Sequence, residues 1–79
     1  MTMTAFILAK LSPEESGMDL LNEIRTDEFV EEAFLIYGAF DLIVKVEVKN
    51  PEDLDSFIFN RLRKVRGVLD TATCICASC

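Results

Sequence analysis

The chain has 79 residues, of which 51% are apolar, 14 are acidic and 8 are basic, so its net charge is −6. A chain of this length forms one domain and buries only about 60–65% of the surface that its unfolded form exposes, so association with other chains is a common source of further stability. Negative charge repels phosphate backbones, and proteins that bind nucleic acids carry a basic patch, so the composition argues against direct binding of DNA or RNA.

The first elements in chain order are a strand and a helix. Residues 4–11 form an apolar run of the length of a strand buried on both faces. Ser12 is a good N-cap, Pro13 fits the first helical position and Glu15 completes a capping box, so we expect a helix from Pro13 to about Arg25. Its inner face would carry Met18, Leu20, Leu21 and Ile24.

Two further strands follow, joined by a glycine turn. Residues 29–37 predict the second strand, and Gly38 with Ala39 predicts a turn. Residues 40–48 alternate plainly and predict the third strand. Its core face would carry Leu42, Val44, Val46 and Val48, and its other face Asp41, Ile43, Lys45 and Glu47.

A second helix and a last strand complete the pattern. Asn50 is a suitable cap with Pro51 at the first helical position, and Gly67 is placed to end the helix. The apolar stripe of this helix contains Leu54, Phe57, Ile58, Leu62 and Val65. Residues 71–77 predict the fourth strand.

The two halves of the chain repeat each other with a shift of 38 residues, which brings Pro13 onto Pro51. The same shift brings Ser12 onto Asn50, Leu20 onto Ile58, Ile24 onto Leu62, and Phe6 and Leu8 onto Val44 and Val46. Two strand–helix–strand halves joined at Gly38 give the βαββαβ order of a ferredoxin-like α+β fold. Right-handed crossovers then place both helices on one face of a four-stranded antiparallel sheet.

The opposite face of this sheet lacks a covering layer in the predicted fold. One candidate set of its side chains is Ile43, Lys45, Glu47, Cys74 and Cys76, with parts of the first two strands. A bare face with apolar side chains indicates association, and a two-fold dimer that packs sheet against sheet is the natural solution. We therefore expect the domain to be dimeric through its sheet.

The sequence offers little catalytic or metal-binding chemistry. It contains no histidine, no evident pair of nucleophile and base, and no phosphate-binding loop, so we expect neither an enzyme nor a cofactor. Structural zinc sites need four ligands, whereas Cys74, Cys76 and Cys79 are three, so we interpret them as small strand residues and not as a metal site. A metal site shared across a dimer remains the alternative. The basic residues Arg61, Arg63, Lys64 and Arg66 would complement the dipole at a helix end.

The start of the chain indicates no targeting segment. Residues 1–4 place no basic residue ahead of the apolar run 5–9, which is far shorter than the roughly 20 residues of a membrane helix. Three cysteines within the last six residues do not form a disulfide framework. We expect a cytoplasmic protein that contacts no membrane and consists of a single domain, residues 1–79.

The turn between the central strands is the most informative segment. Asp41 stands where an apolar residue would serve a strand equally well. Its carboxylate would pair with Lys45, cap the turn through its own backbone, or meet the ammonium group of a ligand. Thr71 and Thr73 share one face of the last strand and would offer hydroxyl groups to the same ligand, although threonine is also a common strand residue.

Two segments resemble a known family. Residues 37–46 (YGAFDLIVKV) are similar to the Gly-x-Tyr/Phe-Asp hairpin of the leucine-responsive/AsnC family of prokaryotic transcription regulators. Residues 66–68 (RGV) and 71–73 (TAT) resemble the closing Pro-Gly-Val…Thr-x-Thr strand of that family. The similarity covers nearly the whole chain and corresponds to the effector-binding and oligomerisation domain, often called the RAM domain. The chain departs from the pattern at Tyr37, where many members carry a small polar residue, and at Arg66, where many carry proline.

The resemblance implies a ligand, a site and partners. An amino acid or related metabolite would bind near the hairpin and the last strand, where dimers meet and often form rings. The residues implied to face it are Gly38, Phe40, Asp41, Thr71 and Thr73. The family's regulators carry an N-terminal helix-turn-helix, and this chain resembles the stand-alone form without one, which would assemble with itself or with full-length regulators.

Two other functions stay open at this point. One is a structural assembly or adaptor domain that binds no ligand. The other is a small dimeric enzyme of the ferredoxin-like type, such as a monooxygenase, against which the absence of histidine argues.

Overall fold

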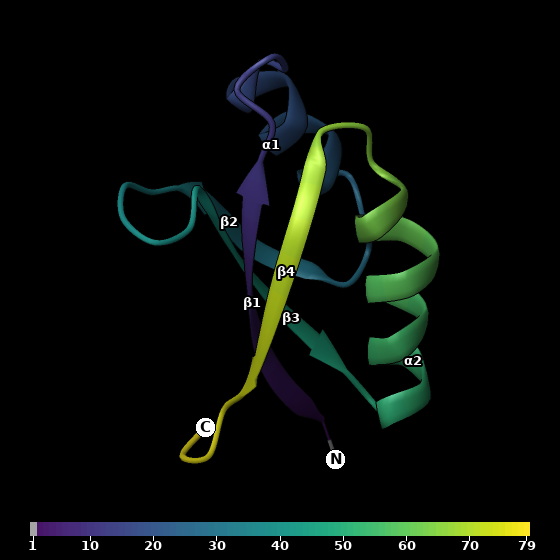
Figure 1. The fold of residues 1–79 in the computed structure, drawn as a ribbon. Helices are drawn as coiled ribbons and strands as arrows, with labels where there is room; N and C mark the ends of the chain where they lie inside the picture. Colours follow the sequence, from purple (N-terminus) through teal and green to yellow (C-terminus); the bar gives the residue numbers. More distant parts are fainter. Residues whose placement is uncertain (1) are drawn as a thin grey trace.

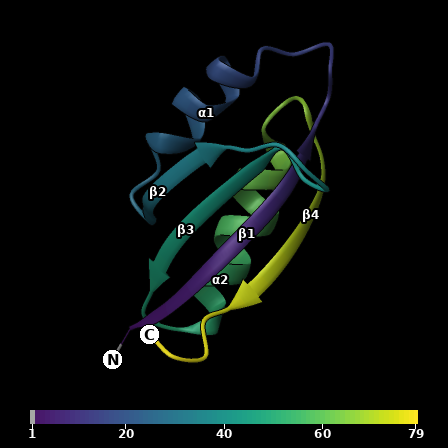
Figure 2. The same cartoon turned by 90° about the vertical axis from the view of Figure 1, so that its left-hand side faces the viewer.

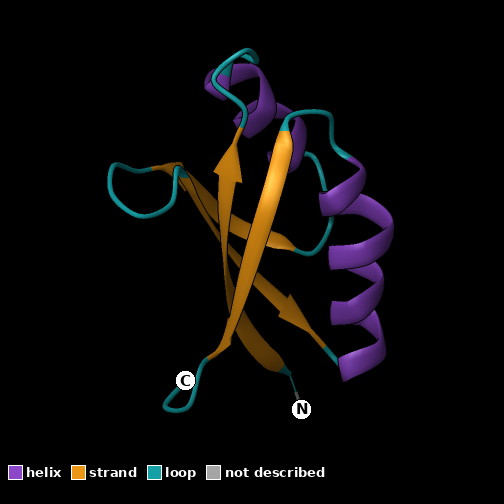
Figure 3. Ribbon diagram, in the orientation of Figure 1, coloured by secondary structure: helices purple, strands orange, loops and turns teal. Residues whose placement is uncertain are grey.

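The structure is a computed structural model that describes residues 2–79; Met1, which the predicted domain of residues 1–79 includes, lies outside the described residues. Its elements are β1 (Met3–Leu11), α1 (Gly17–Arg25), β2 (Val30–Leu35), β3 (Leu42–Val48), α2 (Pro51–Ser56), a π-helical turn (Phe57–Arg61), a 3₁₀ turn (Leu62–Lys64) and β4 (Val68–Ile75). The strands form one antiparallel sheet in the order β2-β3-β1-β4. Both helices lie on one side of it (Figures 1 and 3), which confirms the predicted ferredoxin-like α+β fold.

The core lies between the sheet and the two helices. The side chains on the core faces of β1 and β3 are at most 2% exposed, and they are Ala5, Ile7, Ala9, Leu42, Val44, Val46 and Val48. The helices add Leu20, Leu21, Ile24, Leu54, Phe57, Ile58 and Leu62, all buried as predicted. Met18 was expected on the inner face of α1 but is 53% exposed; α1 begins only at Gly17, so Met18 lies in its first turn.

The internal repeat matches the core residues of the two helices but aligns the first and third strands one residue out of register. In the observed register Ile7 pairs with Val44 and Ala5 with Val46. Phe6 and Leu8, which the shift of 38 residues placed on core residues of β3, therefore point away from the core. Side chains alternate with a period of two along a strand, so a displacement of one residue moves a whole set to the other face.

The first helix begins four residues later than predicted, and Ser16 caps it instead of Ser12. The Ser16 hydroxyl accepts a hydrogen bond from the backbone N–H of Asp19 at 3.3 Å. Ser12 cannot complete the expected capping box because its N–H already donates to the carbonyl of Gly67 at 2.7 Å. The segment from Ser12 to Glu15 instead forms a turn that leads from β1 to α1.

The second helix begins as predicted and changes its pitch midway. The Asn50 side chain accepts a hydrogen bond from the N–H of Asp53 at 2.9 Å, and Pro51 occupies the first turn. From Phe57 to Arg61 the helix widens into a π-helical turn, after which Leu62 is still buried in the core. Such wider turns shift the residues that follow them around the helix axis. Val65, the last residue of the predicted stripe, is only partly buried against the core.

The strand bounds differ from the prediction at the two glycines. β2 stops at Leu35 and β3 starts at Leu42. The six residues between them form a loop that contains Gly38, whose φ is 141°. The fourth strand was expected at residues 71–77, but β4 begins directly after Gly67, which has φ 101°. Glycine reaches these angles without a Cβ clash, so each loop turns at its glycine.

The sheet face opposite the helices is uncovered within residues 2–79. Figure 2 looks onto this face, with α2 behind the strands. The register places Phe6, Leu8, Phe34, Ile43, Lys45 and Cys74 side by side on it, and we call these six residues the open sheet face. Ile43, Lys45 and Cys74 thus lie where the sequence predicted, and Glu47 shares the face opposite Thr4. In both views the two ends of the described chain lie at the same end of the sheet.

Candidate functional site

A cleft of about 450 Å³ opens between the β2–β3 loop and the turn that precedes α1. Its walls come from the end of β1, the following turn and the end of β2, and they consist of Leu11, Ser12, Pro13, Glu15, Gly17, Leu35, Ile36, Tyr37 and Asp41. Most of these side chains are apolar, and the carboxylates of Glu15 and Asp41 are the charged groups among them. A concave apolar surface with a few convergent polar groups is typical of a small-molecule site.

Asp41 is fixed in this wall by hydrogen bonds to β1. Its N–H donates to the carbonyl of Ala9 at 2.9 Å, and its Oδ2 accepts from the N–H of Leu11 at 3.0 Å. Its carbonyl accepts from the N–H of Ile36 at 2.9 Å and closes the loop at its base. The pairing with Lys45 that the sequence left open does not occur. Asp41 is half-buried and lines the cleft, and its second carboxylate oxygen carries none of these bonds.

The loop from Tyr37 to Phe40 projects away from the sheet (Figure 1). Tyr37 is fully exposed, and Phe40 is half-buried. Within the described chain, the backbone hydrogen bonds at this loop involve Ile36 and Asp41 at its base and none of the four residues between them. The N–H groups of these four residues are therefore free to donate to a ligand or a neighbouring chain.

Of the five predicted ligand-facing residues, Asp41 lines the cleft. Gly38 and Phe40 lie on the adjoining loop. Thr71 and Thr73 lie on β4, opposite Ala9 and Ile7 of β1, and are not among the residues that line the cleft. Because β1 separates β3 from β4, the two threonines are about two strand spacings, roughly 10 Å, from β3. One chain therefore brings together Asp41 and the loop but not the threonines.

Sequence reasoning missed the contribution of the turn before α1. Ser12, Pro13 and Glu15 were interpreted as a helix start, and they instead form a wall of the cleft. Glu15 is held there by Arg66, whose Nε lies 3.1 Å from the Glu15 carboxylate. A second capping serine at position 16 was the signal in the sequence that the helix begins later.

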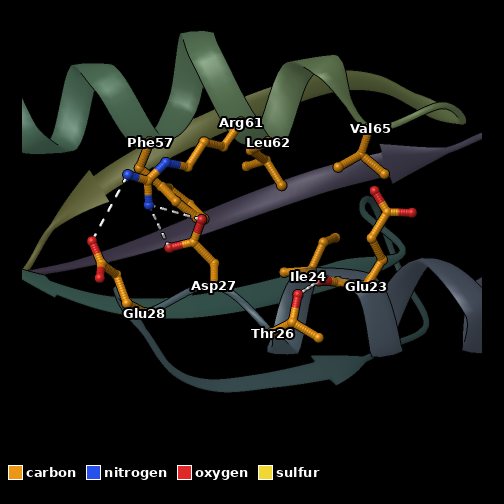
Figure 4. Close-up of a pocket in the computed structure, with 9 residues that line it drawn as sticks. All are labelled: Glu23, Ile24, Thr26, Asp27, Glu28, Phe57, Arg61, Leu62 and Val65. Atoms are coloured by element: carbon orange, nitrogen blue, oxygen red, sulfur yellow. Dashed lines mark hydrogen bonds and ion pairs between the residues drawn. The ribbon is translucent and has the colours of Figure 1, made fainter.

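A second cleft, of about 520 Å³, lies between α1 and the second helix (Figure 4). Arg61 spans it at one end: its Nη1 lies 3.0 Å from both carboxylate oxygens of Asp27, and its Nη2 lies 3.8 Å from Glu28. Its guanidinium also stacks over the ring of Phe29 at 5.0 Å. These contacts fasten the α1–β2 loop to the second helix, so we assign this cleft a structural role.

The basic cluster near the end of the second helix therefore makes side-chain contacts that the dipole interpretation did not anticipate. Arg61 and Arg66 form ion pairs with residues of the first half of the chain. Arg63 stacks over the ring of Phe59 at 5.4 Å. At least three of the four basic residues are thus engaged with neighbouring side chains and do not form a free basic patch.

The cysteines correct one expectation. Cys76 and Cys79 form a disulfide, and Cys74 remains a free, exposed thiol. The bridge links residues only three positions apart, whereas a disulfide framework joins cysteines that are distant in the sequence. In residues 2–79, no group of three or more His, Cys, Asp or Glu side chains is arranged to hold a metal ion. No helix of this part of the chain is long and apolar enough to cross a membrane.

Comparisons with known proteins agree with this architecture. Residues 4–78 match the family model of the Lrp/AsnC ligand binding domain. The uncharacterized HTH-type transcriptional regulator PH1916 of Pyrococcus horikoshii is 35% identical over 75 residues, which are 91% of this chain and 49% of that protein. The chain thus spans about half the length of the curated relatives it matches.

Two solved structures have similar sequences. The crystal structure of FFRP-DM1 has a TM-score of 0.87 and 36% identity, and the match covers 94% of this chain and 97% of that one. The hypothetical protein PHS023 of Pyrococcus horikoshii has a TM-score of 0.86 and 37% identity, with 96% and 89% covered. The curated relative is a transcription regulator, which agrees with the prediction that the chain is not an enzyme. The chain belongs to the Lrp/AsnC ligand binding domain family.

Proposed function

We propose that this domain binds a small amino-acid-like effector in the cleft beside Asp41 and that it serves transcription regulation. The single observation that carries the proposal is the half-buried carboxylate of Asp41, which is held by β1 through one oxygen and lines an apolar cleft. A carboxylate fixed in this way attracts an ammonium group at short range.

The cleft supplies complementary groups for the rest of an amino acid. The free N–H groups of the loop from Tyr37 to Phe40 are suitable donors to a carboxylate. Leu11, Pro13 and Leu35 offer apolar surface to a side chain. An effector with an ammonium group, a carboxylate and an apolar side chain therefore fits this cleft best.

A protein of the same fold supports the ligand class. The transcriptional regulator NMB0573 of Neisseria meningitidis, whose structure is that of an L-Met complex, has a TM-score of 0.81 to this chain with 18% identity. At this identity the likeness concerns the fold alone, so the choice of amino acid is left to experiment.

Association of copies belongs to the same proposal. The open sheet face carries Phe6, Leu8, Phe34 and Ile43, and we propose that two copies pack these faces together. Thr71 and Thr73 lie opposite Ala9 and Ile7, on the helix side of the sheet, so we propose that they contact the effector bound by a further copy, in an assembly larger than the dimer. Full-length regulators of the family are further candidates as partners.

A thermal-shift screen of the twenty amino acids tests effector binding. A ligand present at 100 times its Kd adds about 2.7 kcal/mol to the free energy of unfolding, which in so small a domain raises Tm on the order of 10 °C. We expect one or more apolar amino acids to produce such a shift at millimolar concentration.

Two variants make the screen specific. Asp41→Asn keeps an acceptor for the Leu11 N–H but removes the charge, and we expect it to abolish the shift. Asp55→Asn removes a carboxylate from the exposed side of α2 and is expected to leave the shift unchanged. If no amino acid stabilises the protein, the domain is one of structural assembly; if both variants respond alike, the ligand binds elsewhere.

A further inference from the structure

The disulfide between Cys76 and Cys79 lies outside the part of the chain that makes up the fold. The N–H of Cys76 donates to the carbonyl of Thr4 at 2.9 Å, so the bridge begins where β4 separates from β1. From there the chain folds back as a short loop (Figure 1, yellow). None of the residues 76–79 belongs to the buried core. The bridge therefore orders a loop at the end of the sheet and does not join two elements.

The bridge is also open to reagents in solution. Cys79 is exposed and Cys76 is half-buried. Because the bond closes a loop of only four residues, it restricts the unfolded chain less than a bridge between distant residues would, so we expect the fold to persist without it. Exposed disulfides of this kind are the ones that exchange with thiols, whereas structural disulfides resist reduction.

The spacing of the two cysteines is that of dithiol–disulfide exchange sites. The segment CASC at residues 76–79 has the C-x-x-C pattern in which one thiol is well placed to close on the other. A third thiol, that of Cys74, lies two residues before Cys76, opposite Phe6 on the open sheet face. In the structure Cys76 is bonded to Cys79, and Cys74 is a free thiol.

We propose that Cys76 and Cys79 form a thiol–disulfide exchange site whose substrates are low-molecular-weight thiols and their disulfides. A thiolate RS⁻ attacks the Sγ of the exposed Cys79, a bond forms between these two sulfurs, and Cys76 leaves as a thiolate. A second RS⁻ attacks the sulfur of R in the mixed disulfide, releasing Cys79 as a thiolate and forming RSSR. Two thiols are oxidised, the protein disulfide gains two electrons, and the protons of the two RSH end on Cys76 and Cys79. The reverse steps, with RSSR as oxidant, close the bridge.

Opening the bridge has a consequence for the open sheet face. It frees residues 77–79 from their closed loop while Cys76 stays bonded to Thr4 through the backbone. Three thiols then lie at the end of the last strand, and that of Cys74 is the one opposite Phe6 on the open sheet face. The domain would thereby respond to the thiol state of its surroundings, and the expected effect on the pairing of copies rests on the proposed function.

A titration with glutathione tests the exchange site directly. The protein is equilibrated at graded ratios of reduced to oxidised glutathione, quenched with acid, alkylated with N-ethylmaleimide and weighed by intact mass spectrometry. We expect Cys76 and Cys79 to become alkylated together in a single transition, from neither at the oxidised limit to both at the reduced limit. The exposed thiol of Cys74 is alkylated at the reduced limit and carries glutathione, identified by its mass, where oxidised glutathione is in excess. The same curve is expected from the oxidised and from the reduced starting material.

Matched variants identify the sulfurs and check the fold. Cys74→Ser is expected to keep the transition, with no alkyl group at the oxidised limit and two at the reduced limit. Cys76→Ser and Cys79→Ser are each expected to lose the paired transition. The far-UV circular dichroism of the wild-type chain is expected to be the same at both limits, because the core does not involve residues 76–79.

Three outcomes would overturn the proposal. These are a bridge that stays closed in excess dithiothreitol, thiols that stay open at every glutathione ratio, and unfolding on reduction, which would make the bridge a structural one. The thiol count is read without amino acids and at any oligomeric state, so its result is independent of the effector screen.

Discussion

Asp41 combines two roles at the residue scale, because its carboxylate both accepts a backbone hydrogen bond and lines the cleft. We predict that Asp41→Ala lowers the free energy of unfolding by about 1–2 kcal/mol, since it leaves the half-buried Leu11 N–H without its acceptor. Asp41→Asn retains an acceptor oxygen, so we expect its free energy of unfolding to fall by about half as much as that of Asp41→Ala, or less. Urea denaturation of the three proteins without ligand measures both values. Equal losses would mean that the negative charge, and not the hydrogen bond, stabilises this end of β3.

The two glycines with positive φ differ in what surrounds them. Gly38 has open space where a Cβ would stand, whereas a Cβ on Gly67 would lie 2.8 Å from Cγ of Glu15 and 3.1 Å from a methyl group of Leu20. Alanine at either position adopts a strained backbone angle, which costs on the order of 1 kcal/mol. We predict that Gly67→Ala lowers stability by about 2–3 kcal/mol and Gly38→Ala by about 1 kcal/mol, measured by urea denaturation.

The close packing around Gly67 has a further consequence for the cleft. Gly67 packs against Glu15, which is one of the wall residues of the cleft beside Asp41. A shift of that side chain would therefore alter the cleft as well as the stability. A Gly67→Ala variant no less stable than Gly38→Ala would show that the turn at Glu15 yields easily.

At the scale of elements, Arg61 joins the second helix to the α1–β2 loop through an ion pair in which its Nη1 bonds both carboxylate oxygens of Asp27. The Arg61 side chain is 41% exposed, so the pair is partly screened by water. We predict a coupling free energy of about 1 kcal/mol from a double-mutant cycle of Asp27→Ala and Arg61→Ala. Arg61→Lys should recover less than half of it, because a compact ammonium group that bonds Asp27 cannot also reach Glu28 and stack over the ring of Phe29 as the planar guanidinium does. Additive losses in the cycle would show that the two residues do not stabilise each other.

The sequence predicted the elements well and their bounds less well, for identifiable reasons. Asn50 caps its helix as predicted because nothing else competes for that turn. Ser12 has equally good local chemistry, but its N–H bonds to Gly67, a residue 55 positions away that a local pattern cannot reveal. The alternation in β3 identified its core face directly, whereas the apolar run of β1 contains no alternation and left its faces ambiguous.

The candidate site was predictable to the same extent. Asp41 was identifiable because a charged residue beside an apolar strand indicates a role other than packing, and the structure places it in a cleft. The turn at Ser12 and Glu15 joins that cleft only through long-range contacts with Gly67 and Arg66, which leave no local signal. The disulfide between Cys76 and Cys79 was missed because the cysteines were judged as a framework of distant pairs.

At the scale of the whole molecule, helices cover one side of the sheet (Figure 2). Apolar residues of the other side remain exposed or half-buried in a single chain. Phe34 on the open sheet face and Phe59 on the helical side are exposed to nearly the same extent, 51% and 53%. Exposure alone therefore does not distinguish them, but their surroundings do. Phe34 pairs with Ile43 on a sheet face, whereas Phe59 is covered by the guanidinium of Arg63.

This pair of phenylalanines gives a matched test of association. We predict that the protein is a dimer or a larger assembly by sedimentation velocity, and that Phe34→Glu dissociates it because a charge cannot be buried between two sheets without a partner. Phe59→Glu introduces the same charge at equal exposure and is expected to leave the sedimentation coefficient unchanged. A wild-type monomer, or an assembly that only Phe59→Glu disrupts, would place the contact on the helical side or remove it altogether. If the protein is a monomer, the effector site has to be completed within one chain, where Thr71 and Thr73 lie too far from Asp41 to contribute.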